Sequence, residues 1–204
     1  MIFSKLFGAS SKKQMGKASS GELLKQATKL KSEGNLDEAV DLVVKAHESA
    51  VNEGVILSSG AYLKLPQYLL AANRNDEAWG VLNSMLANGV TGKRPDREMI
   101  FVEHSQVYAE MAKQLKTENK LIDAAIYSIL STVNWQKGMV EQGREDRAEV
   151  NTEALIGKVE KLLKGQNRES KQEFLTVAID ALEKLGHIEP LQVIKDLKAS
   201  FNKS

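Results

Sequence analysis

The chain has 204 residues, of which 42% are hydrophobic and 27% are charged, within the usual range for a globular protein. Its 28 basic and 27 acidic residues leave a formal net charge of +1, so the charge balance gives no reason to expect nucleic acid as a partner. The chain contains no cysteine, which excludes disulfides, thiolate nucleophiles and cysteine-based zinc sites.

Residues 1–20 differ in composition from the rest of the chain. They include four lysines and no acidic residue, and residues 8–20 are rich in Ser, Gly and Lys, which predicts a flexible basic linker. Four apolar residues ahead of this linker would share one face of a short helix: Ile2, Phe3, Leu6 and Phe7. Such a face suits contact of residues 1–17 with a membrane surface or a partner protein. A tail, or a helix packed back on the domain, is the alternative.

The first residues do not form the continuous apolar core of a signal peptide, because Ser4 and Lys5 interrupt them. The sequence also has no run of about 18 apolar residues, the length that a membrane-spanning helix needs. We therefore expect a cytoplasmic protein without a membrane span.

From Gly21 onward, apolar residues recur with the period of an amphipathic helix, and no segment alternates as a strand does. The predicted helices span about residues 21–33, 36–53, 58–72, 75–88, 96–117, 121–135, 152–164, 169–185 and 188–201. The charged stretch 141–149 is predicted to be a solvated helix or loop. The sequence therefore predicts an all-α protein with one domain over residues 21–204. The linker 88–95, with two glycines and a proline, is the clearest place for a break.

Three positions predict where helices end or bend. Gly34 should end the first helix in the left-handed conformation, which costs glycine no Cβ clash. Asn35 should cap the second helix, with Glu38 as its capping-box partner. Pro66 falls inside the third predicted helix, where its missing N–H should kink or split that helix.

A turn followed by an acidic residue and an alanine occurs three times, at residues 34–39, 73–78 and 119–124. The hairpins around these turns resemble tetratricopeptide repeats, in which two antiparallel helices pack through small residues and the pairs stack into a solenoid. The positions that carry the resemblance are Leu23, Ala27, Leu30, Gly34, Leu36, Ala39 and Ala46; Tyr62, Leu69 and Ala78; and Tyr108, Ala112, Leu115, Asn119, Leu121, Ala124 and Ser131. The motif alanines are 39 and then 46 residues apart (39 to 78, 78 to 124), against a family period of about 34, so the repeats carry insertions.

The resemblance implies a concave groove lined by the first helix of each hairpin. The residues that would face a ligand there are Leu24, Thr28, Lys31 and Ser32; Leu63, Gln67 and Leu70; and Ala109, Lys113 and Lys116. Their mixture of Leu, Lys and Thr suits an acidic, amphipathic peptide or helix. Leu24 and Thr28 stand where chaperone-binding members carry the Lys and Asn of a carboxylate clamp, so that clamp is absent. A C-terminal helix that covers the groove is the alternative.

The sequence contains no convincing catalytic, metal or cofactor motif. Its histidines, His47, His104 and His187, belong to separate predicted elements and do not have metal-ligand spacing. Arg97 with His104 loosely resembles the Arg and His pair of small helical ribonucleases. The Gly89–Arg94 segment lacks the spacing and the Ser or Thr of a phosphate loop. We therefore expect a protein that is not an enzyme and holds no metal and no cofactor.

These observations favour a helical-repeat adaptor or scaffold that binds another protein or peptide. A toxin-immunity protein, which inhibits its partner, is an alternative within the binding class. A membrane-surface scaffold and a helical ribonuclease are weaker alternatives. Trp79 and Trp135 lie on second helices of their predicted hairpins, and an exposed tryptophan is a common interface anchor. Trp79, beside Ala78 and Leu82, is predicted to pack between hairpins instead.

Overall fold

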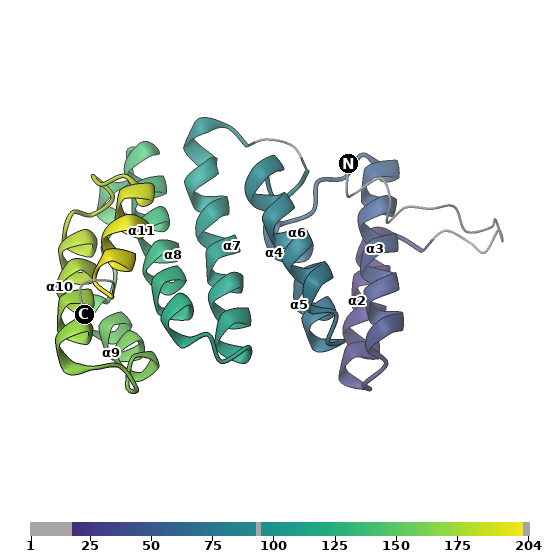
Figure 1. The fold of residues 1–204 in the computed structure, drawn as a ribbon. Coiled ribbons are helices and arrows are strands. Elements are labelled where there is room, and N and C mark those ends of the chain that lie inside the picture. Colours follow the sequence, from purple (N-terminus) through teal and green to yellow (C-terminus); the bar gives the residue numbers. More distant parts are fainter. Residues whose placement is uncertain (1–17, 93–94, 202–204) are drawn as a thin grey trace. The chain divides into compact units, whose positions relative to one another are not determined.

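A computed structural model describes residues 18–92 and 95–201, without the side chains of Arg97 and Glu98. Within these ranges every regular element is a helix, which confirms the predicted all-α class (Figure 1). The linker predicted at residues 8–20 falls largely outside the described residues. The predicted apolar face of Ile2, Phe3, Leu6 and Phe7 falls wholly outside them. In the part of the chain that is described, no helix has both the length and the apolar character needed to cross a membrane.

The chain divides into two compact units, one ending at Ser84 and the other beginning at Met85. The division falls inside helix α6, which spans Asn75–Asn88. We call the two parts unit 1 and unit 2 and describe each by itself.

In unit 1, helices α2 (Ser20–Ser32) and α3 (Leu36–Glu53) form an antiparallel hairpin, and α5 (Lys64–Ala71) packs against α3 (Figure 1). The short helix α4 (Ser59–Tyr62) precedes α5. The hairpin can close tightly because small residues occupy its seam, and these are fully buried: Ala27, Ala39, Ala46 and Ala50. At the open end of the hairpin, Ser20 donates two hydrogen bonds to the Glu53 carboxylate, at 3.0 Å from its backbone N and 2.9 Å from its hydroxyl.

The ends of these helices confirm one prediction and correct another. Gly34 has φ +84°, so it ends the hairpin's first helix in the left-handed conformation as predicted. Asn35 occupies the N-cap of α3, but its side chain makes no capping hydrogen bond, so the capping box predicted there is wrong. A capping box instead opens α2, where Ser19 and Glu22 each accept from the other's backbone N–H.

The predicted split of the third helix is also confirmed. The chain separates into α4 and α5 at Leu63, three residues before Pro66. Pro66 then lies in the first turn of α5, where its missing N–H leaves no helical hydrogen bond unmade. The break therefore precedes the proline because a helix tolerates proline only near its start.

Unit 2 is built on a long antiparallel hairpin of α7 (Arg97–Thr117) and α8 (Leu121–Glu141) (Figure 1). A 3₁₀ turn at Glu145–Arg147 follows, where the sequence predicted a solvated helix or loop. Helices α9 (Thr152–Leu162), α10 (Arg168–Glu183) and α11 (Pro190–Ala199) then pack against α8. Helix α8 continues six residues beyond its predicted end at 135 (141 − 135 = 6).

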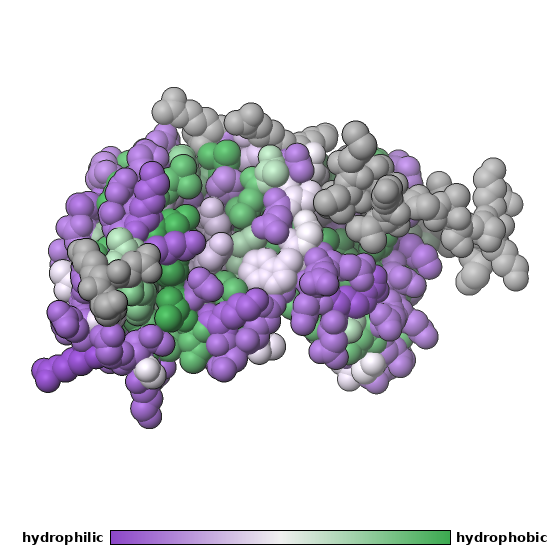
Figure 2. Space-filling view, in the orientation of Figure 1, coloured by the Kyte–Doolittle hydropathy of each residue, from purple (hydrophilic) through white to green (hydrophobic). Residues whose placement is uncertain are grey.

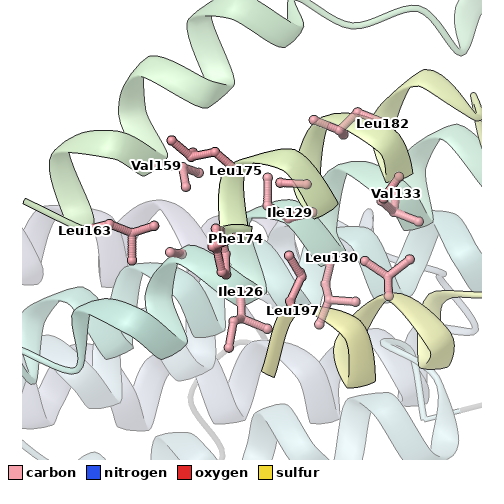
Figure 3. Close-up of a cluster of buried hydrophobic side chains, with 14 residues drawn as sticks. Ile126, Ile129, Leu130, Val133, Val159, Leu163, Phe174, Leu175, Leu182 and Leu197 are labelled. Carbon is pink, nitrogen blue, oxygen red and sulfur yellow. The ribbon is translucent and has the colours of Figure 1, made fainter. Parts of the chain in front are cut away.

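Four helices contribute to the main core of unit 2 (Figure 3). Ile126, Ile129, Leu130 and Val133 project from one side of α8 toward side chains of α9, α10 and α11. Phe174 of α10 is fully buried among them, and its ring centroid lies 5.3 Å from that of Phe201. This core holds α9 in place beside α8, and the position of α9 shapes the cleft described below.

Two glycines allow unusually close packing on α8. A Cβ atom at Gly138 would lie 2.6 Å from the Val102 side chain of α7. A Cβ at Gly186, in the loop after α10, would lie 2.5 Å from the backbone N of Lys137, and Gly186 also has φ +85°. Beside it, the buried Gln136 side chain donates to the Leu182 carbonyl at 3.0 Å. These contacts explain why α8 extends past residue 135. Its last turns pack against α7 on one side and against the loop after α10 on the other.

Candidate binding cleft

An open cleft of about 630 Å³ lies in unit 2 between the second half of α7, the first half of α8 and helix α9. Its volume is in the range of binding pockets for small molecules or for a few side chains of a larger partner. The residues that line it are Ala109, Ala112, Lys113, Lys116, Leu121, Ser128, Ser131, Thr132, Leu155, Lys158, Lys161 and Leu162. Three of them, Ala109, Lys113 and Lys116, were predicted from the sequence to face a ligand.

Four lysines give the cleft its charge, and no acidic residue is among the residues described as lining it. All four side chains are exposed. Lys113 donates to Glu110 at 2.7 Å. The ammonium groups of Lys116, Lys158 and Lys161 have no ion-pair partner among the residues that the structure describes. Three uncompensated cations around one concave surface raise the local potential and favour an anionic ligand.

The floor of the cleft is apolar with a few hydroxyl groups. Its apolar part comes from all three helices: Ala109, Ala112, Leu121, Leu155 and Leu162. Ser128 donates to the Ala124 carbonyl at 2.7 Å and Ser131 donates to the Ser105 carbonyl of α7 at 2.9 Å. These hydroxyl hydrogens are used inside the protein, so the hydroxyls offer a ligand mainly acceptor oxygens. An apolar part of a ligand could therefore be buried against this floor while Ser128 and Ser131 keep the hydrogen bonds that they donate.

The cleft exists because small side chains meet on this side of the α7–α8 hairpin. Ala109 and Ala112 on α7 face Ser128 and Ser131 on α8, and none of them is long enough to fill the space up to α9. On its other side α8 carries the large residues of the core (Figure 3). In the view of Figure 2, the surface of this unit shows apolar areas bordered by hydrophilic side chains.

In unit 1, the predicted ligand-facing residues Thr28 and Lys31 of α2 contact side chains of α5 and do not line the cleft. The Thr28 hydroxyl donates to the Leu24 carbonyl at 2.9 Å and accepts from Tyr68 at 3.2 Å and from Lys64 at 3.1 Å. The Lys31 ammonium lies 4.5 Å from the centroid of the Tyr68 ring, a cation–π contact. The polar groups of Thr28 and the charge of Lys31 therefore have partners within unit 1.

The other candidates of unit 1 differ in exposure. Leu63 is only 6% exposed and belongs to the core of the unit, so the prediction that it faces a ligand is wrong. Gln67 and Leu70 on α5 are half-buried, as is Leu24 on α2. Ser32 is exposed and donates to the Lys29 carbonyl at 2.6 Å. The residues predicted to face a ligand thus fall in two units, and only those on α7 line the cleft.

His47 and His104 make structural contacts within the protein. His104 lies 3.2 Å from the Leu86 carbonyl and packs edge-on against Tyr108, and burial lowers its pKa despite that hydrogen bond and the nearby Glu103. His47 lies 3.2 Å from the Ala61 carbonyl, and burial lowers its pKa as well. The Arg97 side chain lies outside the described residues. Within the described part, no group of three or more His, Asp or Glu side chains could hold a metal ion.

Helix α9 contributes Leu155, Lys158, Lys161 and Leu162 to the cleft, and none of these was predicted from the sequence to face a ligand. A repeated spacing could have drawn attention to them. Lys113 and Lys116 are three residues apart on α7, and Lys158 and Lys161 have the same spacing on α9, so each pair shares one helix face. The sequence does not show that α9 folds back beside α7, because that arrangement depends on tertiary packing.

Comparison of this chain with models of protein families, with curated proteins and with solved structures finds no match. The cleft therefore has to be interpreted from its own chemistry. It combines exposed cations, an apolar floor and hydroxyl acceptors, and it offers no nucleophile paired with a base among its described lining residues. This set of groups is suited to holding an anionic, partly apolar ligand.

Proposed function

We propose that this chain is a non-enzymatic helical-repeat protein that binds an acidic segment of another protein in the cleft of unit 2. One observation carries the proposal: three lysine ammonium groups without ion-pair partners among the described residues surround a concave apolar floor. Unpaired cations on a concave surface attract a negatively charged partner, and the apolar floor adds contact area that a purely ionic site lacks.

The hairpin architecture supports the same proposal. The antiparallel pairs α2–α3 and α7–α8 have the form expected of tetratricopeptide-like repeats, whose usual role is to bind peptides or proteins. Within α7, the predicted ligand-facing residues Ala109, Lys113 and Lys116 line the cleft. Helix α9 forms a wall of this cleft and does not fill it.

The proposal can be tested without knowing the natural partner. The intact chain is used to select binders from a displayed library of random peptides of about 14 residues, without tryptophan. The enriched peptides are expected to combine acidic and apolar residues. Their affinity is then measured by fluorescence anisotropy for the chain and for a variant with Lys116→Glu, Lys158→Glu and Lys161→Glu. We expect a loss of about tenfold or more, since each reversal replaces attraction by repulsion.

A charge-matched control uses Lys195→Glu and Lys198→Glu on α11, which are exposed and do not line the cleft. Added Lys45→Glu, exposed in unit 1 and also outside the lining, makes three lysine reversals in both variants, so the two variants carry the same net charge. The control variant should keep its affinity within about twofold, and the difference should shrink at high salt because exposed charges are screened. A library without enriched acidic peptides, or equal losses in both variants, would refute the proposed cleft.

A further inference from the structure

One exposed aromatic side chain lies on the same face of α8 as the cleft. Trp135 is 36% exposed and follows Ser128 by seven residues and Ser131 by four, so the helix period places it on the face that these residues present. It is not among the residues lining the cleft and lies one turn beyond them. It has no hydrogen bond or ring contact among the described residues. Its indole N–H and part of its ring surface are therefore available to a ligand.

These residues of α8 form a strip that runs from Leu121 to Trp135, and its two ends differ in chemistry. Over fourteen residues at 1.5 Å per residue it is about 21 Å long. The cleft's lysines flank the part that begins at Leu121, and Trp135 forms the other end. One turn further, Met139 is only 3% exposed, because it packs with Val102 and Ala148 in a small second core. That core closes the strip immediately after Trp135.

The chemistry of the walls favours a helical ligand over an extended one. The lining residues belong to α-helices, whose backbone N–H and C=O groups are bonded within each helix, apart from the termini. An extended peptide would find no strand edge here to pair with its backbone. A helix satisfies its own backbone groups and presents only side chains, as in other helix-in-groove complexes.

From these observations we infer that the occupant of the cleft is an amphipathic helix of about 14 residues, with acidic residues at one end and a bulky apolar residue at the other. The acidic end contacts Lys113, Lys116, Lys158 and Lys161, and the apolar end packs on Trp135. The inference rests on the proposed function of the cleft and adds the conformation and the polarity of the partner. Buried aromatic anchors of this kind contribute a large share of the affinity at protein interfaces.

The experiment uses the peptides enriched on the intact chain and a Trp79→Phe variant, in which Trp135 is the only tryptophan. A peptide that covers Trp135 should shift its emission to shorter wavelength at saturation. Trp135→Ala should weaken binding about tenfold or more, whereas Leu191→Ala, at a 70% exposed apolar residue of α11, should leave it unchanged. A proline placed in the middle of the peptide should also abolish binding, since it breaks a helix.

The outcomes separate this inference from the proposed function. Peptides that lose affinity with the three lysine reversals but leave the Trp135 emission and the Trp135→Ala affinity unchanged overturn the inference and retain the function. Peptides that tolerate the central proline overturn the helical conformation. If the library yields no acidic binder but laurate, an anionic amphiphile, binds in the cleft, both proposals fail in favour of a small-molecule site. The emission measurement needs no substitution at Trp135, so it remains decisive if Trp135→Ala is unstable.

Discussion

Lysine and hydroxyl side chains have different surroundings in the two units. In unit 1, the face between α2 and α5 brings together Thr28, Lys31, Lys64 and Tyr68, and these side chains bond to one another. In unit 2, the space between α7 and α9 also has lysines and hydroxyls on its walls, but three lysine ammonium groups have no ion-pair partner among the described residues.

One aromatic ring marks the difference. Tyr68 is 3% exposed; its hydroxyl donates to Thr28, and the Lys31 and Lys64 ammonium groups lie 4.5 and 5.8 Å from its ring centroid. No aromatic side chain lines the cleft of unit 2 in the part of the chain that is described. A face that is filled from within contributes to stability, and a face that stays open remains available for binding. Four predictions concern the packing and the surfaces of the two units, from the largest expected effect to the smallest.

The cleft should depend on the core behind α8. Phe174→Ala removes a fully buried ring from the cluster that holds α9, α10 and α11 together, and should lower the free energy of unfolding of unit 2 by about 3–5 kcal/mol. Hydrogen exchange measured by residue should show faster exchange in unit 2 than in the unchanged chain. Equal loss of protection in unit 1 would show that the two units do not unfold separately.

Two glycines within helices of unit 2 should respond oppositely to alanine. Gly138→Ala places a Cβ against Val102 and should destabilise the α7–α8 hairpin by about 1–3 kcal/mol through overpacking. Gly157→Ala on α9 meets nothing within 4 Å and should stabilise the chain by about 0.5–1 kcal/mol, because alanine has the higher helix propensity. Urea titrations of both variants measure the two changes. A stabilising Gly138→Ala would contradict the close packing of α7 on α8.

The free energy of unfolding of unit 1 should decrease when polar contacts between α2 and α5 are removed. Tyr68→Phe deletes the hydrogen bond to Thr28 and should cost about 1 kcal/mol. Lys116→Ala in the cleft should cost close to nothing, since its ammonium group has no ion-pair partner among the described residues. Both are measured by chemical denaturation. A similar cost for the two variants would remove the contrast between a filled and an open face.

The smallest effect should be a loss of stability in mild acid. Burial holds the pKa of His47 and of His104 below the ordinary value of 6.5 in the folded chain. Below about pH 6.5 the unfolded chain therefore binds protons that the folded chain does not, and the stability present above that pH decreases as the pH falls toward the folded-state pKa. Unfolding free energies at several pH values, with and without His47→Gln and His104→Gln, measure the contribution of the two histidines to the pH dependence of stability. An unchanged pH slope in the double variant would contradict it.

Much of the fold could be predicted from helix periodicity. The helical class, the turn at Gly34 and the split near Pro66 all follow from local residue preferences. The end of α8 could not be predicted, because Gln136, Lys137 and Gly138 look like a polar helix end in sequence. In the structure Gln136 is fully buried and Gly138 lies against Val102, so tertiary contacts extend the helix.

The candidate site could be predicted in part for a similar reason. Ala109, Lys113 and Lys116 were found because the repeat pattern specifies which face of α7 is free of hairpin packing. Leu63 was misplaced because the interruption before Pro66 changes the phase of the helix, and the residue is buried. Lys158 and Lys161 belong to a helix that joins the site only through long-range packing. Sequence periodicity carries no information about such a partner.

The backbone approach at Gly186 has a consequence for recognising distant relatives of this chain. Any side chain there would overlap main-chain atoms of α8, which cannot move aside as a flexible side chain can, and the left-handed φ adds a second penalty. Most surface positions can drift freely over evolution, but this one should keep its glycine wherever the loop after α10 seats on α8. An invariant glycine between two amphipathic helices, about 48 residues after another on the preceding long helix (186 − 138 = 48), is therefore a signature with which diverged homologues can be sought.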